Sequence, residues 1–174
     1  VSAIAAKLIA RHPHIFSGVH DGHASQTERW ETLKARERAA EGATSALDGI
    51  ALALPALMRA EKLQKRAARV GFDWPDPAGP AAKLLEEVEE LANAAPSDRE
   101  MEAGDVLFSA VNLVRSYGIA PEDALRAANA KFERRFRAME QMARQAGADF
   151  AELPIEEQER YWQAAKASER QKTA

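Results

Sequence analysis

The sequence contains no cysteine, which excludes disulfide bonds, thiolate metal ligands and thiol nucleophiles. This composition fits a reducing compartment, so we expect a cytoplasmic protein. No apolar run approaches the roughly 18 residues of a membrane-spanning helix, and the N-terminus carries no signal-peptide pattern. The net charge of −3 gives no general argument for nucleic acid or an anionic membrane, and we expect neither as a partner. The phosphate-binding patterns GxxxxGKS/T and GxGxxG are also absent.

Apolar residues at helical spacing are abundant, by contrast. Of the 174 residues, 46% are hydrophobic, which is enough to build the core of one domain, with or without an appendage. Proline and glycine separate the periodic stretches, as they do between helices. We therefore predict an all-α fold, a helical bundle organised around an antiparallel helix hairpin. Short helices are predicted before residue 42, and from residue 45 on the predicted helices are 55–70, 80–95, 98–117, 121–145 and about 155–170.

The hairpin formed by 80–95 and 98–117 dominates the pattern. Pro96 ends its first helix, and Ser97 with Glu100 three residues later has the spacing of a capping box that begins the second. A connection this short makes the two helices antiparallel neighbours.

Carboxylates punctuate both helices of this hairpin. Glu87 and Glu90 lie on one shoulder of the first helix, beside its apolar stripe, and Glu102 and Asp105 lie in a narrow polar seam of the second. Both pairs have i,i+3 spacing, so each pair converges on one point. Buried carboxylates need a partner, and hard divalent cations such as Mg²⁺ take oxygen ligands and also hold substrate phosphates. The alternative is that EEVEE is an ordinary solvated acidic face.

The second helix is apolar around most of its circumference, which is typical of a buried helix. Its apolar residues occupy more sides than one small bundle would cover. We therefore expect a homodimer whose interface buries part of it, and the residues concerned are Phe108, Val111, Leu113, Val114 and Tyr117.

Basic residues border two other predicted helices. On 121–145, Lys131 and Arg135 flank the apolar stripe together at i,i+4, where they can either bind phosphate oxygens or snorkel around the core edge. The helix 55–70 is strongly basic too, and attraction of a polyanionic substrate and a solvated face remain equally good interpretations.

At the carboxylates the sequence resembles a known family. EExxE, made by Glu86, Glu87 and Glu90, is followed by ExxD, and this order is similar to the all-α nucleoside triphosphate pyrophosphohydrolases. The words GFDWPD (71–76), LEEVEEL (85–91), GDVLFSAVNLVR (104–115) and ANAKFERRFR (128–137) resemble the C-terminal domain of the bacterial MazG family in particular.

The resemblance implies Mg²⁺-dependent hydrolysis of nucleoside triphosphates to a monophosphate and pyrophosphate, with Mn²⁺ as a possible substitute for Mg²⁺. Residues 45–174 would form the catalytic domain, and 1–44 would be the tail of a preceding domain and its linker. This chain, which begins with valine, would then be a fragment of a two-domain protein. The resemblance also implies a dimer. The metal ligands would be Glu87, Glu90, Glu102 and Asp105.

Other candidate residues follow with less support from spacing. Glu86 is a candidate for supporting the metal site or activating water, although its helical phase points outward. The general base cannot be read from the sequence. The candidate nucleotide contacts are Lys83, Arg99, Lys131, Arg134, Arg135 and, by resemblance, Trp162.

Two other functional interpretations stay open. One is a non-catalytic helical interaction module, because tandem members of this superfamily often carry one weakened domain. The other is a related pyrophosphatase that acts on dUTP or phosphoribosyl-ATP. The presence of all four ligand candidates favours a catalytic domain over the interaction module.

Overall fold

The structure is a computed structural model that describes residues 42–173. Within this range it contains helices and no strand, which confirms the predicted all-α class. The predicted tail and linker, 1–44, lies outside the described residues apart from 42–44. None of the described helices has the length and apolar character that a membrane span needs. The helices are α4 (Ala56–Ala68), α5 (Ala78–Asn93), α6 (Arg99–Ser116), α7 (Pro121–Gln145), the 3-10 helix η1 (Phe150–Glu152) and α8 (Ile155–Thr173).

The described residues divide into two compact units, one made of 42–53 with 62–73 and the other of 54–61 with 74–173. In the first unit, Arg66 Nη1 donates a hydrogen bond to the carbonyl oxygen of Ala46 at 3.0 Å. All the predicted site residues belong to the second unit, which contains α5 to α8.

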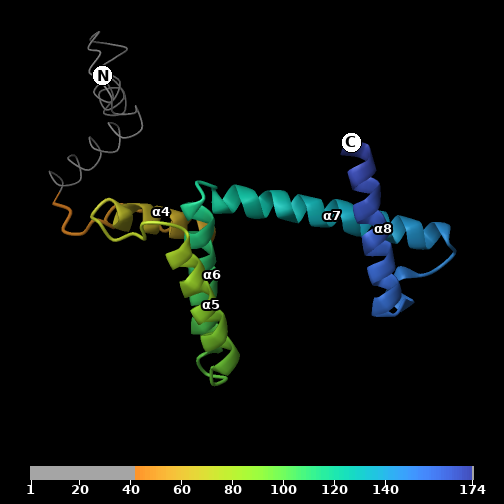
Figure 1. The fold of residues 1–174 in the computed structure, drawn as a ribbon, viewed down its shortest axis with the longest axis horizontal. Coiled ribbons are helices and arrows are strands. Elements are labelled where there is room, and N and C mark those ends of the chain that lie inside the picture. The colour runs from red at the N-terminus through yellow and green to blue at the C-terminus, as the bar shows by residue number, and fades with distance from the viewer. Residues whose placement is uncertain (1–41, 174) are drawn as a thin grey trace, which may run out of the picture. The chain divides into compact units, whose positions relative to one another are not determined.

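Helices α5 and α6 form the predicted antiparallel hairpin (Figure 1). Their bounds lie within two residues of the predicted 80–95 and 98–117. The predicted capping box is wrong. Asp98 takes the N-cap position of α6 without a side-chain hydrogen bond to the helix, and its carboxylate instead accepts the Ser97 hydroxyl at 3.0 Å.

A tryptophan packs against the start of α5. The indole ring of Trp74 covers Gly79 so closely that a Cβ atom added at Gly79 would lie 2.5 Å from Trp74 Cδ2. Pro80, in the same first turn of α5, is fully buried. The segment before the hairpin is therefore fixed to α5 by a contact that requires glycine.

Burial in the hairpin differs from the expectation of a buried second helix. Val111 is only 3% exposed, but Leu107 and Tyr117 of the same region are 61% and 65% exposed. On α5, Leu85 is 67% exposed. The polar seam of α6 lies toward α5, because oxygens of Glu102 and Asp105 approach Glu87 and Ser109 is buried. A single chain thus leaves much of the hairpin's apolar surface uncovered.

Helix α7 contacts both η1 and α8, and α8 crosses α7 in Figure 1. A continuous series of aromatic contacts joins these elements. The ring centroids of Phe132 and Trp162 are 5.7 Å apart, those of Phe132 and Phe136 are 5.8 Å apart, and Phe136 meets Phe150 edge to face at 5.4 Å. Such pairs stabilise beyond the area that they bury. They fix the orientation of Trp162 relative to α7.

Candidate functional site

Three carboxylates converge between α5 and α6. One ligand oxygen from each of Glu87, Glu102 and Asp105 lies within 4.8 Å of the others. Glu102 and Asp105 share one face of α6 because they are three residues apart, and the antiparallel pairing brings Glu87 of α5 opposite them. Glu87 is only 5% exposed, Glu102 is half-buried and Asp105 is exposed. We call this set the acidic group.

The acidic group has the chemistry of a hard-cation site. Its donors are carboxylate oxygens, which Mg²⁺ and Mn²⁺ prefer over nitrogen or sulfur ligands. Three like charges this close repel one another, and a divalent cation among them would remove that repulsion. The residues present therefore fit a divalent cation.

Lys83 supplies the positive charge nearest to the acidic group. Its Nζ lies 2.8 Å from Glu87 Oε1 and 2.6 Å from Glu86 Oε1. Hydrogen bonds to Glu86 and Glu87 raise the pKa of Lys83 above its ordinary value. The buried Glu87 is thereby paired, whereas an unpaired charge at this depth would be strongly destabilising. Lys83, predicted as a phosphate contact, is bound to two carboxylates in this structure.

Glu90 and Glu86 lie outside the acidic group. Glu90 is an exposed residue whose pKa is raised, mainly by loss of solvent around its carboxyl group. The positive charge of Lys83 opposes this rise in pKa. The negative charge of Glu87 and a hydrogen bond between Glu87 and Glu90 add to it. Glu90 therefore stays close to a member of the acidic group. Glu86 is exposed and bound to Lys83, in keeping with its outward helical phase.

Lys131, Arg134 and Arg135 of α7 form a basic group that contacts α8. Arg135 Nε is 2.7 Å from Glu169 Oε2, and Arg134 Nε is 3.6 Å from Glu169 Oε1. The guanidinium carbon of Arg135 also lies 5.4 Å from the Trp162 ring centroid, within cation–π range. The hydrogen bond from Arg135 is the main cause that lowers the pKa of Glu169, and the charge of exposed Lys131 contributes.

Glu169, the acidic partner of the basic group, is the residue that sequence reasoning missed. It follows Trp162 by seven residues, two helical turns, so the two share a face of α8. That spacing was a usable signal once Trp162 had been singled out. The pairing with Arg135, 34 residues earlier, depends on how α8 packs on α7.

The remaining predicted contact, Arg99, begins α6 and is exposed, without an ion pair among the described residues. Within the same range, no ion pair joins the acidic group to the basic group. The structure thus brings most of the predicted site residues together as two sets, one on the hairpin and one on α7 with Trp162 of α8, and Arg99 stands apart from both.

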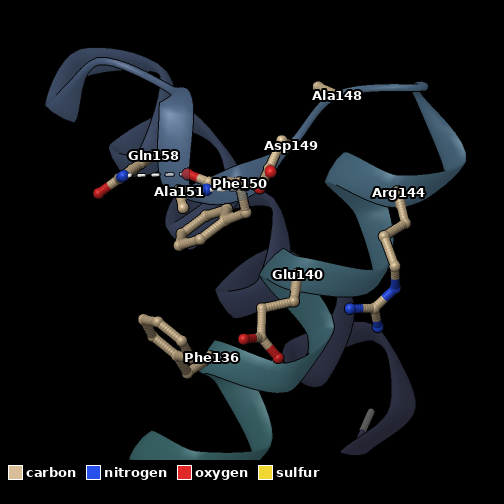
Figure 2. A pocket seen from close by; sticks show the side chains of 8 residues that line it. All are labelled: Phe136, Glu140, Arg144, Ala148, Asp149, Phe150, Ala151 and Gln158. Carbon is tan, nitrogen blue, oxygen red and sulfur yellow. Dashed lines mark hydrogen bonds between the residues drawn. The ribbon is translucent and has the colours of Figure 1, made fainter.

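A hollow of about 640 Å³ lies where α7, η1 and the start of α8 meet. Figure 2 shows Phe136, Glu140 and Arg144 of α7 on one side and the η1 segment on the other. Gln158 fixes the η1 segment by donating to the carbonyl oxygens of Phe150 and Leu153 at 3.2 and 3.1 Å. The hollow adjoins the aromatic series through Phe136.

Comparison with known proteins gives a consistent result. The family model of the MazG nucleotide pyrophosphohydrolase domain matches residues 78–139, which include the acidic group. The chain is 44% identical over 175 residues to a nucleoside triphosphate pyrophosphohydrolase of Escherichia coli K12, covering 97% of this chain and 66% of that protein. It is 43% identical over 164 residues to the nucleoside triphosphate pyrophosphohydrolase/pyrophosphatase MazG of Thermotoga maritima, covering 94% and 63%.

A third relative is the uncharacterized protein YabN of Bacillus subtilis, which is 38% identical over 176 residues, covering 98% of this chain and 36% of that protein. The chain therefore spans 66% or less of the length of each of these three relatives.

Proposed function

Because this chain belongs to the MazG family, we propose that it hydrolyses nucleoside triphosphates to nucleoside monophosphate and pyrophosphate. One observation carries the proposal: Glu87, Glu102 and Asp105 converge between α5 and α6, inside the segment that the family model matches. Water attacks the α-phosphorus, the bond from that phosphorus to the bridging oxygen breaks, and pyrophosphate leaves.

The acidic group would hold Mg²⁺, which Mn²⁺ can replace, and Glu90 completes the proposed ligand set. When bound, the cation supplies positive charge to phosphate oxygens and a template for in-line attack. Glu86 remains a candidate base, because it shares Lys83 with Glu87. Deprotonation of the attacking water by a carboxylate at this edge of the site would raise its nucleophilicity.

The basic group would bind the triphosphate. Arginine matches phosphate oxygens with a planar fork of donors, and lysine acts as a point charge. We assign this role to Arg134, Arg135 and Lys131, with Arg99 and Lys83 as further contacts. Trp162 offers an aromatic face beside them for the nucleoside. These charges would neutralise the leaving pyrophosphate as negative charge builds on it.

We also propose a homodimer, a catalytic domain comprising 45–174 and a cytoplasmic location. Support for the dimer comes from the exposed apolar side chains of the hairpin. Phe108 and Tyr117 are 43% and 65% exposed, as expected of interface residues, whereas Val111 is already buried within one chain. Leu113 and Val114 are half-buried.

The experiment is a pyrophosphate-release assay on the purified chain with the common ribo- and deoxyribonucleoside triphosphates, dUTP and phosphoribosyl-ATP. We expect release of pyrophosphate that requires Mg²⁺ or Mn²⁺ and stops when a chelator is added. Selective turnover of dUTP or phosphoribosyl-ATP would favour the narrower activity. No release from any nucleotide at any metal concentration would leave the non-catalytic module as the function.

A further inference from the structure

The carboxylate of Glu169 contacts the Nε atoms of two arginines of α7. Its two carboxylate oxygens lie 2.7 Å from Arg135 Nε and 3.6 Å from Arg134 Nε. The Arg135 side chain is only 18% exposed, whereas that of Arg134 is 64% exposed. The contact with Arg135 is therefore shorter and less accessible to water, and it is the one expected to hold a fixed geometry.

The atoms that Glu169 leaves unused are the informative ones. Guanidinium carries five N–H donors, and four of them are on the terminal nitrogens Nη1 and Nη2. The Nε atom of Arg135 donates to Glu169, while its terminal nitrogens make no hydrogen bond to any described residue. The side of arginine that forms two parallel bonds with a phosphate is thus left available.

A second contact fixes the plane of the same guanidinium. Its carbon lies 5.4 Å from the Trp162 ring centroid, and Trp162 is itself held by Phe132 at 5.7 Å. Arg135 is consequently restrained by a carboxylate at Nε and by an aromatic ring at its face. A long side chain restrained in this way loses less conformational freedom when it binds a ligand.

We propose that Glu169 is a positioning residue that holds Arg135 with its terminal nitrogens ready to bind the phosphate oxygens of the substrate. This inference rests on the proposed function, since it names what Arg135 binds. The opposite role for Glu169 is that of a competing anion that must be displaced before phosphate can bind. The two roles predict changes of opposite sign when Glu169 is neutralised.

The first test is steady-state kinetics of Glu169→Gln with saturating Mg²⁺. Positioning predicts that KM for the triphosphate rises about tenfold while kcat changes less than about twofold, as for loss of an interaction that ground and transition states share equally. Glu156→Gln is the matched control, because Glu156 is exposed on the same helix and pairs with no described residue. A fall in KM would show a competing anion and overturn the proposal.

The second test asks whether the effect passes through Arg135. In an Arg135→Lys background, Glu169→Gln should raise KM less than about twofold further, because lysine has no Nε to be held. An equal rise in both backgrounds would reveal a merely structural role and overturn the proposal. Glu169→Asp, which keeps the charge, should recover part of the lost affinity.

Calorimetric measurement of inorganic triphosphate binding in the presence of Mg²⁺ tests the positioning role of Glu169 separately from the proposed hydrolysis. If the wild-type chain binds triphosphate without turnover, the proposed function fails while Glu169 is still tested by the affinities of the variants. Weaker binding by Glu169→Gln supports positioning. Equal or tighter binding by Glu169→Gln overturns the positioning role, and so does a wild-type chain that binds no triphosphate.

Discussion

Single carboxylates are the finest scale at which the proposed chemistry can be tested. We expect Glu87→Gln and Asp105→Asn each to reduce turnover by at least about a hundredfold. Loss of a residue that orients a metal ligand costs about 10–100-fold in activity, and loss of the ligand itself should cost more. The proposed Mg²⁺ site predicts that Mg²⁺ raises the melting temperature by binding the folded state, and this rise should be absent in both variants. Thermal melts with Mg²⁺ titrated, together with pyrophosphate release, measure both effects.

The two variants should differ when no metal is added. Asp105→Asn removes one of three converging charges and should raise the melting temperature. Glu87→Gln also breaks the ion pair with Lys83, so its melting temperature should be lower than that of Asp105→Asn. Glu89→Gln serves as the control, since Glu89 is exposed and lies outside the acidic group. Full activity in either ligand variant would refute the assignment.

Residues that follow from spacing along one helix were the predictable part of the site. The i,i+3 pairs brought Glu102 and Asp105 together, and the short connection placed Glu87 opposite them. The role of Glu169 could not be read in the same way, because its partner Arg135 lies on another helix. The i,i+4 spacing of Lys83 and Glu87 is a local signal for their ion pair, but the sequence analysis predicts Lys83 only as a phosphate contact.

At the scale of one element, the start of α5 makes a stability prediction. Alanine normally stabilises a helix relative to glycine. At Gly79, however, the added Cβ would collide with the Trp74 ring. We expect Gly79→Ala to lower the free energy of unfolding by about 1–3 kcal/mol, the usual cost of overpacking. Urea denaturation measures it.

Gly104 in α6 is the matched control for this substitution. A Cβ there meets no atom within 4 Å, so Gly104→Ala should raise the free energy of unfolding by about 0.5–1 kcal/mol. If both substitutions stabilise the chain equally, the packing of Trp74 against α5 is not a constraint.

Element positions were largely predictable because their signals are local. The range predicted for α7, 121–145, is the range observed. Proline at the first turn and glycine after the last explain this, and Gly147 has the positive φ of 74° expected beyond a helix end. The helix η1 was not predicted, since three residues are too few to show a period. The capping box failed because Asp98 was adjacent and took the N-cap.

On the scale of the whole molecule, the uncovered hairpin surface predicts self-association. Light scattering at micromolar concentration should give twice the chain mass. Leu107→Lys should yield a monomer, because a charge in an apolar interface is costly to bury. Ile155→Lys, at a residue that is 69% exposed at the start of α8, should leave the mass unchanged. A monomeric wild-type chain would rule out the proposed dimer.

The ion pair between Lys83 and Glu87 has a consequence for the order of events in the life of the chain. In small metal-dependent domains such as zinc fingers, the apo chain is unfolded and the ion drives folding. Here the most buried carboxylate of the acidic group already has a counter-charge from its own helix, one turn away. We therefore expect the hairpin to fold without a metal ion and a divalent cation to bind the folded chain afterwards. A chelator would withdraw the cation and leave a folded, idle scaffold that can be recharged.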